Sequence, residues 1–490
     1  MAVKDLREWI ALLEREGELA RVAAEVDPDL EITEIVERTI RGGGPALLFE
    51  HPKGACHPLL INQFGTERRM CLAFGVERLD DVAAKLSEVL EMQPPSGLVE
   101  KVRGLQKLKS IADSRPETVK RGPAQEIVLR GDEVDLGVLP VQRCWPGDPA
   151  PFITLPAVIT LDPSTGARNV GMYRMQVIDG RTTFMHWQIH KDGRADWLAS
   201  GGGRLEVAVA LGLDPVSAYS ASAPLPKHID EFMLSGFLRG EPVELVKGVT
   251  VDLEVPAHAE IVLEGYVAAD ELGEEGPFGD HTGYYTPAEP FPVFHVTAMT
   301  MRRDAIYPSI VVGKPPQEDA WLGKATERIF LPAIRTSVPE IVDYDLPVAG
   351  AFHNCCIVSI RKAFPGHAAK VMHAIWGLGM LSLTKCVIVV DAHVDVHDYE
   401  QVTFYAGANV DPKRDVVLSE GPLDHLDHAP ERQFLGGKLG IDATAKWPEE
   451  GARPWPEEIE MSPEIRELVD RRWADYGIPL VPRDGDRRIR

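Results

Sequence analysis

The spacing of apolar side chains changes twice along this 490-residue chain, and each change indicates a different kind of structure. Behind Asp5, apolar residues recur every three or four positions, which predicts an N-capped helix at the start. Strands are predicted at 46–49 and 59–62, and a second helix at 80–90. This alternation predicts a first α/β domain, which ends at the turn-forming run Gln93-Pro-Pro-Ser-Gly97.

In the middle of the chain the apolar period approaches two, which is typical of strands with one buried face. Turn signals at 162–166 and 179–180 separate successive strands, and helices are predicted near 205–213 and 229–238. The predicted strands lie at 152–161, 169–178, 182–189, 249–255, 261–267 and 293–301. The pattern predicts antiparallel β structure, most simply a barrel, interrupted by helices.

Beyond Tyr307 helical and strand patterns alternate again. Helices are predicted at 320–331 and 368–378, and buried strands at 355–360 and 386–391. This alternation predicts a second α/β region.

A last helix is predicted to begin at Ser462 and Pro463 and to end at Gly477. Its apolar stripe needs a surface to cover it. A second subunit or the chain's own C-terminal domain would serve.

Composition narrows the class of protein. The length predicts two or three domains, and 44% hydrophobic with 26% charged residues is typical of a globular protein. A net charge of −23 disfavours binding to nucleic acid or to an anionic membrane, and no apolar run is long enough to span a membrane. The six cysteines contain no Cys-x-x-Cys pair, so a reducing cytoplasm is the expected compartment.

One segment, Glu275-Gly-Pro-Phe-Gly-Asp280-His-Thr-Gly-Tyr-Tyr285, combines two acids with residues that favour a tight turn. If the two acids are held together in a pocket, the pKa of one of them is expected to rise towards neutrality, because a neighbouring like charge and burial both oppose ionisation. The alternative is a Gly-Pro turn whose acids face water, and on the segment alone this alternative is favoured.

Three other motifs carry less chemistry. The run Asp391-Ala-His393-Val-Asp395-Val-His397-Asp398 follows a buried strand, so its polar residues are interpreted as caps and loop. His186 and His190 have metalloprotease spacing but lack the glutamate, so that reading is rejected. The glycine runs at 201–203 and 436–440 are weak candidates for phosphate loops.

An amide, an imidazole and a carboxylate at Asn169, His190 and Glu231 would suit a divalent ion such as Mn²⁺ or Mg²⁺, especially with a phosphate in the shell. Spacing alone does not select these three from the many residues of their kinds.

Five motifs occur in the order found in the UbiD family of reversible decarboxylases that use prenylated FMN, and the resemblance covers nearly the whole chain. They are Asn169-Val-Gly-Met-Tyr173-Arg174, His186-Trp-Gln-Ile-His190, Glu231 with Gly236-Phe-Leu-Arg-Gly240, the Glu275–Tyr285 segment, and Gly437-Lys438-Leu-Gly-Ile-Asp442-Ala-Thr444. The sequence resembles the 3-polyprenyl-4-hydroxybenzoate decarboxylases of that family.

The resemblance implies an α+β multidomain protein. It would have an N-terminal α/β domain (1–120), a central split β-barrel that holds the flavin (121–310), and a C-terminal α/β domain (311–490) with a terminal oligomerisation helix. A homo-oligomer, either a dimer or a hexamer, is implied as well.

The resemblance also implies the cofactor site. Asn169, His190 and Glu231 would hold a Mn²⁺ that bridges the protein to the cofactor phosphate, and a K⁺ is expected nearby. The residues implied to contact prenylated FMN are Thr154, Asn169, Met172, Tyr173, Arg174, His186, Trp187, Gln188, His190, Lys191, Glu231 and Lys438.

The catalytic residues implied are Arg174, Glu275 and Asp280, in a carboxy-lyase whose cofactor bonds covalently to the substrate. Arg174 would orient the substrate carboxylate, and the two acids would act as a coupled acid–base pair. Asp280 is the expected proton donor, although the division of roles between the acids stays open. Asp280 favours an aromatic acid as substrate, whereas His186 departs from the arginine of hydroxybenzoate enzymes.

This reading makes one structural demand. Strict alternation places Asn169 and Arg174 on opposite faces of a strand, so the chain must bend or bulge near Gly171.

The resemblance thus implies an enzyme that decarboxylates an aromatic or α,β-unsaturated acid and receives its cofactor from a flavin prenyltransferase. Two other functions are alternatives to it. One is an FMN-dependent oxidoreductase on a split-barrel fold, for which no nicotinamide site is evident. The other is a non-catalytic assembly protein, which the joint presence of Arg174, Glu275 and Asp280 disfavours. The identity of the acid and the physiological direction stay open.

Overall fold

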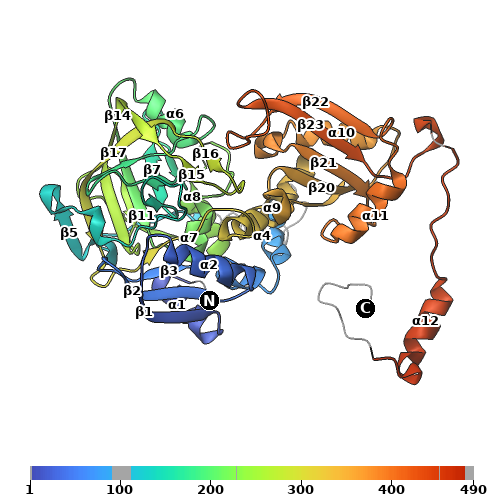
Figure 1. Cartoon of the computed structure of the whole chain (residues 1–490), viewed down its shortest axis with the longest axis horizontal. Coiled ribbons are helices and arrows are strands. Elements are labelled where there is room, and N and C mark those ends of the chain that lie inside the picture. The colour runs from blue at the N-terminus through green and yellow to red at the C-terminus, as the bar shows by residue number, and fades with distance from the viewer. Residues whose placement is uncertain (1–2, 91–111, 228, 452, 480–490) are drawn as a thin grey trace, which may run out of the picture. The chain divides into compact units, whose positions relative to one another are not determined.

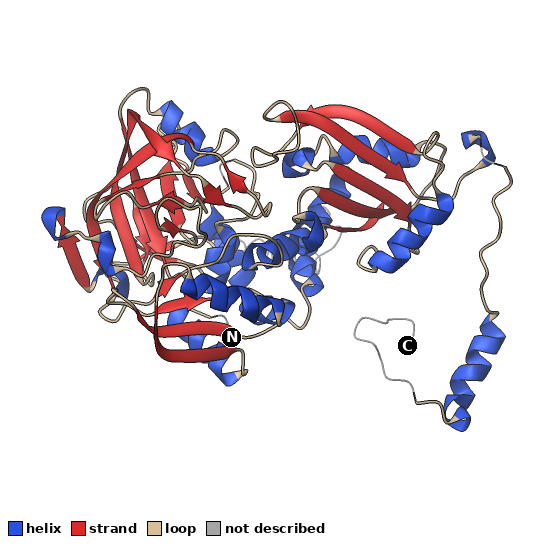
Figure 2. Cartoon of the chain, viewed as in Figure 1, coloured by secondary structure: helices blue, strands red, loops and turns tan. Residues whose placement is uncertain are grey.

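A computed structural model describes residues 3–90, 112–227, 229–451 and 453–479 (Figures 1 and 2). The predicted break at 93–97 lies outside these residues. The chain divides into two compact units, residues 1–444 and 445–490, each considered by itself below.

The N-terminal part of the first unit is a small mixed sheet covered by helices. Its strands, in spatial order, are β1 (Leu19–Val26), β2 (Ala46–Pro52), β3 (Leu59–Ile61) and β18 (Tyr307–Pro308). The helices of this part are α1 (Leu6–Arg15), α2 (Glu31–Arg41), α3 (Glu67–Phe74) and α4 (Asp80–Leu90). The predicted elements of this region are confirmed, including the Asp5 cap, whose carboxylate accepts from the backbone N–H groups of Arg7 and Glu8.

Next along the chain is a seven-stranded antiparallel sheet (Figure 2). Its strands, in spatial order, are β10 (Thr182–Phe184), β17 (Glu289–Met301), β14 (Ile261–Glu275), β11 (Arg204–Leu211), β7 (Ala157–Leu161) and β8 (Arg168–Gly171), while β5 (Ile127–Arg130) also pairs with β17. The order has two ends, so within the described ranges this sheet is not a closed barrel. Its inward side chains, Val207, Leu263 and Phe294 among them, form one large core.

Short paired strands and three helices surround this sheet and position the loops of the site. The strand pairs are β6 (Phe152–Ile153) with β9 (Met175–Gln176), β15 (Phe278–Gly279) with β16 (Tyr285–Thr286), and β12 (Glu244–Lys247) with both β13 (Glu254–Pro256) and β4 (Glu117–Thr118). The helices are α6 (Asp192–Ala199), α7 (Pro215–Ser220) and α8 (Glu231–Arg239).

A five-stranded sheet ends the first unit. Its strands, in spatial order, are β19 (Ile341–Asp345), β20 (Cys355–Ile360), β21 (Cys386–Asp391), β23 (Leu435–Asp442) and β22 (Val416–Pro422), and its helices are α9 (Glu318–Ser337), α10 (His367–Ile375) and α11 (Tyr399–Asn409). The strand pairs β20–β21 and β21–β23 are parallel, and β20 and β21 are rich in buried apolar residues, as the sequence predicts.

The second unit contains the helix α12 (Pro463–Arg472) behind its N-cap Ser462, followed by a short 3₁₀ turn that ends before Gly477. Its boundaries are those predicted. None of its described side chains is buried, and Ile465, Leu468 and Trp473 remain well exposed.

Two predicted elements of the middle region are wrong. Most of the predicted helix at 205–213 is instead the central strand β11, which ends at Leu211, because this apolar run is hydrogen-bonded on both sides, to β14 and to β7. Residues 249–255 are mostly loop instead of a strand. There the backbone N–H groups of Val249 and Thr250 donate to the buried carboxylate of Glu264, which replaces a strand ladder.

No described helix is both long enough and apolar enough to cross a membrane.

Candidate active site

The two acids of the central motif lie on either side of a sharp turn at the end of β14. Glu275 is the last residue of β14, and Gly276 follows with a φ of +97°, a conformation that favours glycine. The N–H of Gly276 donates to Oε1 of Gln176 (2.7 Å), which ties the turn to β9. The chain then forms β15, and Asp280 follows it, so the turn points both carboxylates at one place.

Arg174 joins the two acids. Its Nε donates to Oε1 of Glu275 (2.8 Å) and its Nη1 to Oδ2 of Asp280 (2.6 Å), while Nη2 reaches Oε2 of Glu275 (3.2 Å) and the hydroxyl of Thr286 (3.3 Å). The guanidinium lies 4.3 Å from the ring centroid of Phe278. Glu275 and Asp280 are buried, so the acid network predicted from the resemblance is assembled away from bulk water.

The guanidinium sets the charge of both acids. Burial alone would raise the pKa of Glu275, but the charge of Arg174 and a hydrogen bond from His186 lower it to about 2. Burial likewise opposes ionisation of Asp280, yet His281 and Arg174 hold its pKa well below the usual range. The expectation that one acid has a raised pKa is therefore wrong for this arrangement, because a cation lies between the two carboxylates.

His186 takes part in the same network. Its Nδ1 lies 2.8 Å from Oε2 of Glu275, and its Nε2 lies 3.3 Å from the side-chain nitrogen of Gln188. Burial and the nearby charge of Arg174 lower the pKa of His186, so the ring is neutral and hydrogen-bonds as a polar group. The motif at 186–190 is a loop that follows β10, so the strand predicted at 182–189 is confirmed only over 182–184. A loop at this place also agrees with rejecting the metalloprotease reading.

Beyond Asp280 the network continues into the C-terminal part of the unit. Oδ1 of Asp280 accepts from the backbone N–H of His281 (2.8 Å) and lies 2.9 Å from Nδ1 of the same residue. Nε2 of His281 lies 2.7 Å from Nε2 of His353, which precedes β20. Four side chains from three separate segments, Arg174, Asp280 with His281, and His353, are thus linked in one chain.

The bend required near Gly171 is confirmed. β8 ends at Gly171, residues 172–174 leave the sheet, and β9 begins at Met175. The N–H of Met172 donates to the carbonyl of Ala221 instead of to a neighbouring strand. A Cβ atom on Gly171 would lie 2.1 Å from Cζ of Tyr173, so glycine is needed here to accommodate that ring.

Two of the three predicted metal ligands lie close together. Asn169 is on β8, Glu231 is the first residue of α8, and Oε2 of Glu231 accepts from the N–H of Val170 (2.8 Å). Burial raises the pKa of Glu231 to about 8. His190 is exposed, with its ring centroid 6.0 Å from that of Phe434. The three-residue metal site stays a prediction.

The remaining residues predicted to bind the cofactor lie in different surroundings. Thr154 is buried and its hydroxyl donates to the carbonyl of Ile310 (2.7 Å). Trp187 is fully buried beside Tyr173, and Lys191 is the N-cap residue of α6, where burial lowers its pKa. Lys438 lies on β23 and its Nζ donates to the carbonyls of Ser382 (2.5 Å) and Thr384 (2.9 Å), so it is engaged within the C-terminal sheet.

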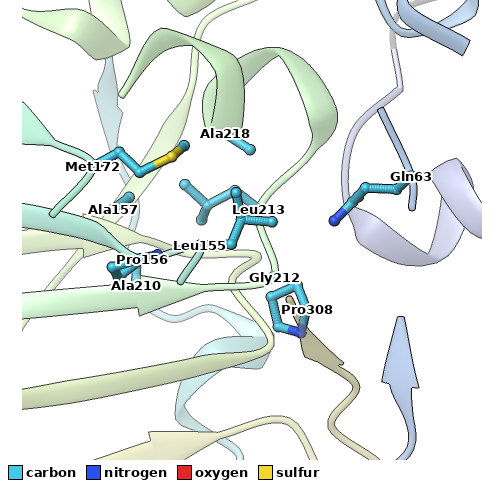
Figure 3. A pocket seen from close by; sticks show the side chains of 10 residues that line it. All are labelled: Gln63, Leu155, Pro156, Ala157, Met172, Ala210, Gly212, Leu213, Ala218 and Pro308. Carbon is cyan, nitrogen blue, oxygen red and sulfur yellow. The ribbon is translucent and has the colours of Figure 1, made fainter. Parts of the chain in front are cut away.

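One cavity in this region is too small to be the reaction site. It measures about 10 Å³, the size of one water, and is lined mainly by apolar side chains (Figure 3). Met172 contributes to its wall from one side and Gln63 from the other, whereas Arg174, Glu275 and Asp280 do not line it.

Several supporting residues were not predicted from the sequence. Asp148 accepts from the N–H groups of Gly279 (2.9 Å) and Trp145 (2.9 Å), and the ring of Trp145 occupies the space that a Cβ on Gly279 would need. His353 also escaped prediction, since no local pattern marks it. His281, by contrast, stands inside the motif and was available as a candidate.

The aspartate- and histidine-rich run at 391–398 behaves as caps and ion pairs. Asp398 caps α11 by accepting from the N–H of Gln401, and Nδ1 of His397 lies 3.0 Å from Oδ1 of Asp345. Glu327, Asp345 and His397 converge closely enough to hold a metal ion, but the ammonium of Lys324 is already bonded to both carboxylates.

Comparison with known proteins identifies the family to which this arrangement belongs. Three family models of the 3-octaprenyl-4-hydroxybenzoate carboxy-lyase match the chain: the N-terminal domain at residues 10–87, the Rift-related domain at 117–315 and the C-terminal domain at 320–443. A protein of Archaeoglobus fulgidus is 55% identical over 97% of this chain and 99% of its own length, and one of Aquifex aeolicus is 52% identical over 97% and 99%. Both are described as uncharacterized.

Solved structures agree. The UbiD-class enzyme HmfF from Pelotomaculum thermopropionicum, in complex with FMN, is 31% identical with a TM-score of 0.79, over 95% of this chain and 99% of that one. The vanillic acid decarboxylase of Sedimentibacter hydroxybenzoicus is 27% identical, and its closed form gives a TM-score of 0.85 over 98% of this chain and 100% of that chain. An open form of that enzyme gives 0.79 over 97% and 99%.

The multidomain α+β fold and the matching family models thus identify the chain as a carboxy-lyase. The chain belongs to the UbiD family.

Proposed function

We propose that this chain reversibly decarboxylates an aromatic or α,β-unsaturated carboxylic acid with the help of prenylated FMN. The observation that carries the proposal is the buried network of Arg174, Glu275 and Asp280, in which a guanidinium lies within 2.8 Å of both carboxylates. A structural ion pair does not need two acids on one buried arginine, since the second acid adds desolvation cost. A site that binds a carboxylate and then protonates carbon does need both.

The residues around Tyr173 fit a bound flavin phosphate. The indole N–H of Trp187 is buried and has no acceptor among the described residues, and Trp187 packs against Tyr173 on the segment assigned to the cofactor. An anionic group bound on this side would supply that acceptor. HmfF is known both with FMN and, in an evolved dimeric form, with prFMN.

The proposed metal site has suitable chemistry. Asn169 and Glu231 offer oxygen ligands, and the carboxylate of Glu231 is buried beside a backbone N–H. A divalent cation would offset that charge, and Mn²⁺ held by Asn169, His190 and Glu231 would link it to the cofactor phosphate. A K⁺ nearby is part of the same proposal.

When bound, prenylated FMN supplies an electron sink for the carbon that loses CO₂. The protein supplies orientation and a proton. Arg174 holds the substrate carboxylate in the buried site, which excludes water from the reacting carbon. Asp280 gives the proton to that carbon, and Glu275 keeps Arg174 in place. His186 in turn holds Glu275 in place. Hydroxybenzoate enzymes carry an arginine at the position of His186, so the substrate pocket of this chain differs locally from theirs.

The proposal also includes the association of subunits and the source of the cofactor. α12 would join copies of the chain into a dimer or a hexamer, because its apolar side chains are exposed within its own unit. A flavin prenyltransferase would provide the cofactor. The cytoplasm is the proposed compartment.

Mass spectrometry of the bound flavin tests the cofactor. Protein coexpressed with a flavin prenyltransferase should release a flavin heavier than FMN and should exchange ring hydrogens of product arenes for deuterium. Only unmodified FMN, bleached by NAD(P)H, would instead indicate an oxidoreductase.

The variant Asp280→Asn tests the assigned proton donor. The amide keeps the shape of the side chain but only one acceptor oxygen, for either Arg174 or His281, and it cannot give a proton. Flavin binding should persist, because Asp280 is not among the residues predicted to contact the cofactor, while kcat should fall by about 10²–10⁴-fold. The matched control is Asp148→Asn, which changes a buried aspartate supporting the same loop without touching Arg174. It should lower kcat by less than about tenfold, and full turnover by Asp280→Asn would refute the role.

A further inference from the structure

Non-oxidative decarboxylation replaces a carbon–carbon bond by a carbon–hydrogen bond and therefore consumes one proton in each turnover. This inference rests on the function proposed above. His281 and Arg174 together hold Asp280 as a carboxylate, as described, so the expected donor carries no proton at rest. A closed, buried site needs a second group that keeps the proton at hand.

His281 is placed to be that group. The two oxygens of Asp280 face different partners: Oδ2 faces the guanidinium of Arg174, and Oδ1 faces Nδ1 of His281 at 2.9 Å. A guanidinium does not release a proton in proteins, whereas an imidazolium does so near neutral pH. Of these two partners, only His281 is able to return a proton to Asp280.

The contact with His353 limits how the protons can be distributed. The two Nε2 atoms are 2.7 Å apart, a hydrogen-bond distance, so one nitrogen carries a hydrogen and the other is bare. With Nδ1 of His281 donating to Asp280 and its Nε2 donating to His353, His281 carries both hydrogens and a positive charge. His353 is then neutral with its hydrogen on Nδ1, an atom that is buried and has no hydrogen-bond partner among the described residues.

The charges around the pair favour the same assignment. Burial opposes a charge on His281, but Asp280 raises its pKa, with help from Asp319 at the start of α9 and Asp424 between β22 and β23. Burial and the charge of His281 lower the pKa of His353 to about 4, against the weaker attraction of Asp424, Asp280 and Asp427. The cation therefore resides on the ring next to the catalytic carboxylate.

We propose that His281 is an imidazolium that stores the proton used in each turnover, and that His353 is a positioning residue that keeps it charged by accepting its second hydrogen. In the step, the Nδ1–H bond of His281 breaks as an O–H bond forms on Asp280. That O–H bond then breaks as the carbon that has lost CO₂ gains a hydrogen. His281 is left neutral with its hydrogen on Nε2, and it regains a proton from solvent when product leaves.

The first test needs no flavin and no activity. In protein labelled with ¹³C at histidine Cε1, the signal lost in His281→Gln is followed by NMR from pH 5 to pH 9. His281 should titrate above 6.5, and His353→Leu, which removes the acceptor, should lower that pKa by about one unit. His353→Gln retains an acceptor and should restore most of the shift.

The control is His428→Leu. His428 packs on Tyr284 of the same motif, with ring centroids 4.1 Å apart. The variant therefore removes a histidine beside the motif without changing any residue of the chain from Asp280 to His353. It should leave the pKa of His281 unchanged. A titration of His281 at or below 6.5, or an equal shift in His428→Leu, would overturn the assignment.

The second test uses enzyme loaded with prenylated FMN. The basic limb of the kcat–pH profile should move to lower pH in His353→Leu by the same amount as the NMR pKa, with KM changed by less than about twofold. An unmoved limb with normal turnover would overturn the proton store alone. Absence of turnover and of arene exchange in the wild type at every pH would instead overturn the proposed function, and the catalytic role of His281 with it.

Discussion

At the scale of single residues, the site depends on one arginine holding two acids that would otherwise repel each other. Arg174 and Glu275 are 101 positions apart, and Arg174 and Asp280 are 106 apart, so the network also ties the break between β8 and β9 to the turn that follows β14. A carboxylate stabilised in this way contributes to folding only while it is ionised. The charge state of the site and the stability of the loops are therefore linked through pH.

This linkage gives a prediction for Glu275. Its pKa is lowered to about 2 from an ordinary value of 4.5, so its contribution is complete above pH 4.5 and is lost as pH falls towards 2. Between pH 5 and pH 3 the wild type should lose about 2 kcal/mol of unfolding free energy that Glu275→Gln does not lose. Urea unfolding at the two pH values measures the difference.

The control for this prediction is Glu420→Gln. Glu420 pairs with Arg432 on the surface, where water and salt screen the pair, so this variant should follow the wild-type pH dependence. Equal pH dependence of Glu275→Gln and the wild type would show that the Arg174 network does not stabilise the fold.

At the scale of elements, the break between β8 and β9 decides where Arg174 points. It occurs because Tyr173 folds back over Gly171, in space that a side chain would fill. Gly171→Ala places a Cβ 2.1 Å from Cζ of that ring, and the ring has to move. We expect a loss of about 1–3 kcal/mol of unfolding free energy and weaker flavin binding, since Tyr173 and Arg174 are displaced together.

Gly407→Ala is the matched substitution. Gly407 lies within α11 with nothing close to the position of an added Cβ, so alanine should leave stability unchanged or raise it by up to about 1 kcal/mol. Thermal unfolding and flavin titration of both variants test the argument. A neutral effect at Gly171 would mean that the Tyr173 ring does not fix the break.

The same scale shows what the sequence could and could not reveal. Strands β14 and β17 were predictable because 261–267 and 293–301 are rich in β-branched and aromatic residues, and the cap at Asp5 is a local signal. β11 was mistaken for a helix because both of its faces are buried from Val207 to Leu211, so this run shows no alternation of apolar and polar residues. The loop at 249–255 was mistaken for a strand because its alternation gave no sign that Glu264 would bind its N–H groups.

The features of the candidate site also fall into those that the sequence could reveal and those that it could not. The resemblance named Arg174, Glu275 and Asp280, and the turn residues explained why the two acids come close. The lowered pKa values were not predictable, because they depend on where the guanidinium lies. His353 was beyond reach as well: it meets His281 across 72 positions, and nothing in its neighbourhood marks it as functional.

At the scale of the whole molecule, the exposed side chains of the second unit lead to a prediction about the association of subunits. Considered by itself, this unit leaves Ile465 and Leu468 of α12 and Trp473 of the following 3₁₀ turn exposed, an apolar stripe that costs free energy in water. A second copy of the chain would cover it. We therefore expect the full chain to sediment as a dimer or larger assembly, and a chain ending at residue 444 to be folded but less associated.

Point variants separate the stripe from the mere presence of the tail. Ile465→Ser combined with Leu468→Ser should dissociate the assembly, because both side chains belong to the apolar stripe. Glu467→Ala changes a polar side chain of the same exposed helix and should leave the mass unchanged. Sedimentation of the three proteins at micromolar concentration decides the matter. A double variant that sediments like the wild type would place the subunit interface elsewhere, whereas a wild-type monomer would remove the oligomeric role of α12 altogether.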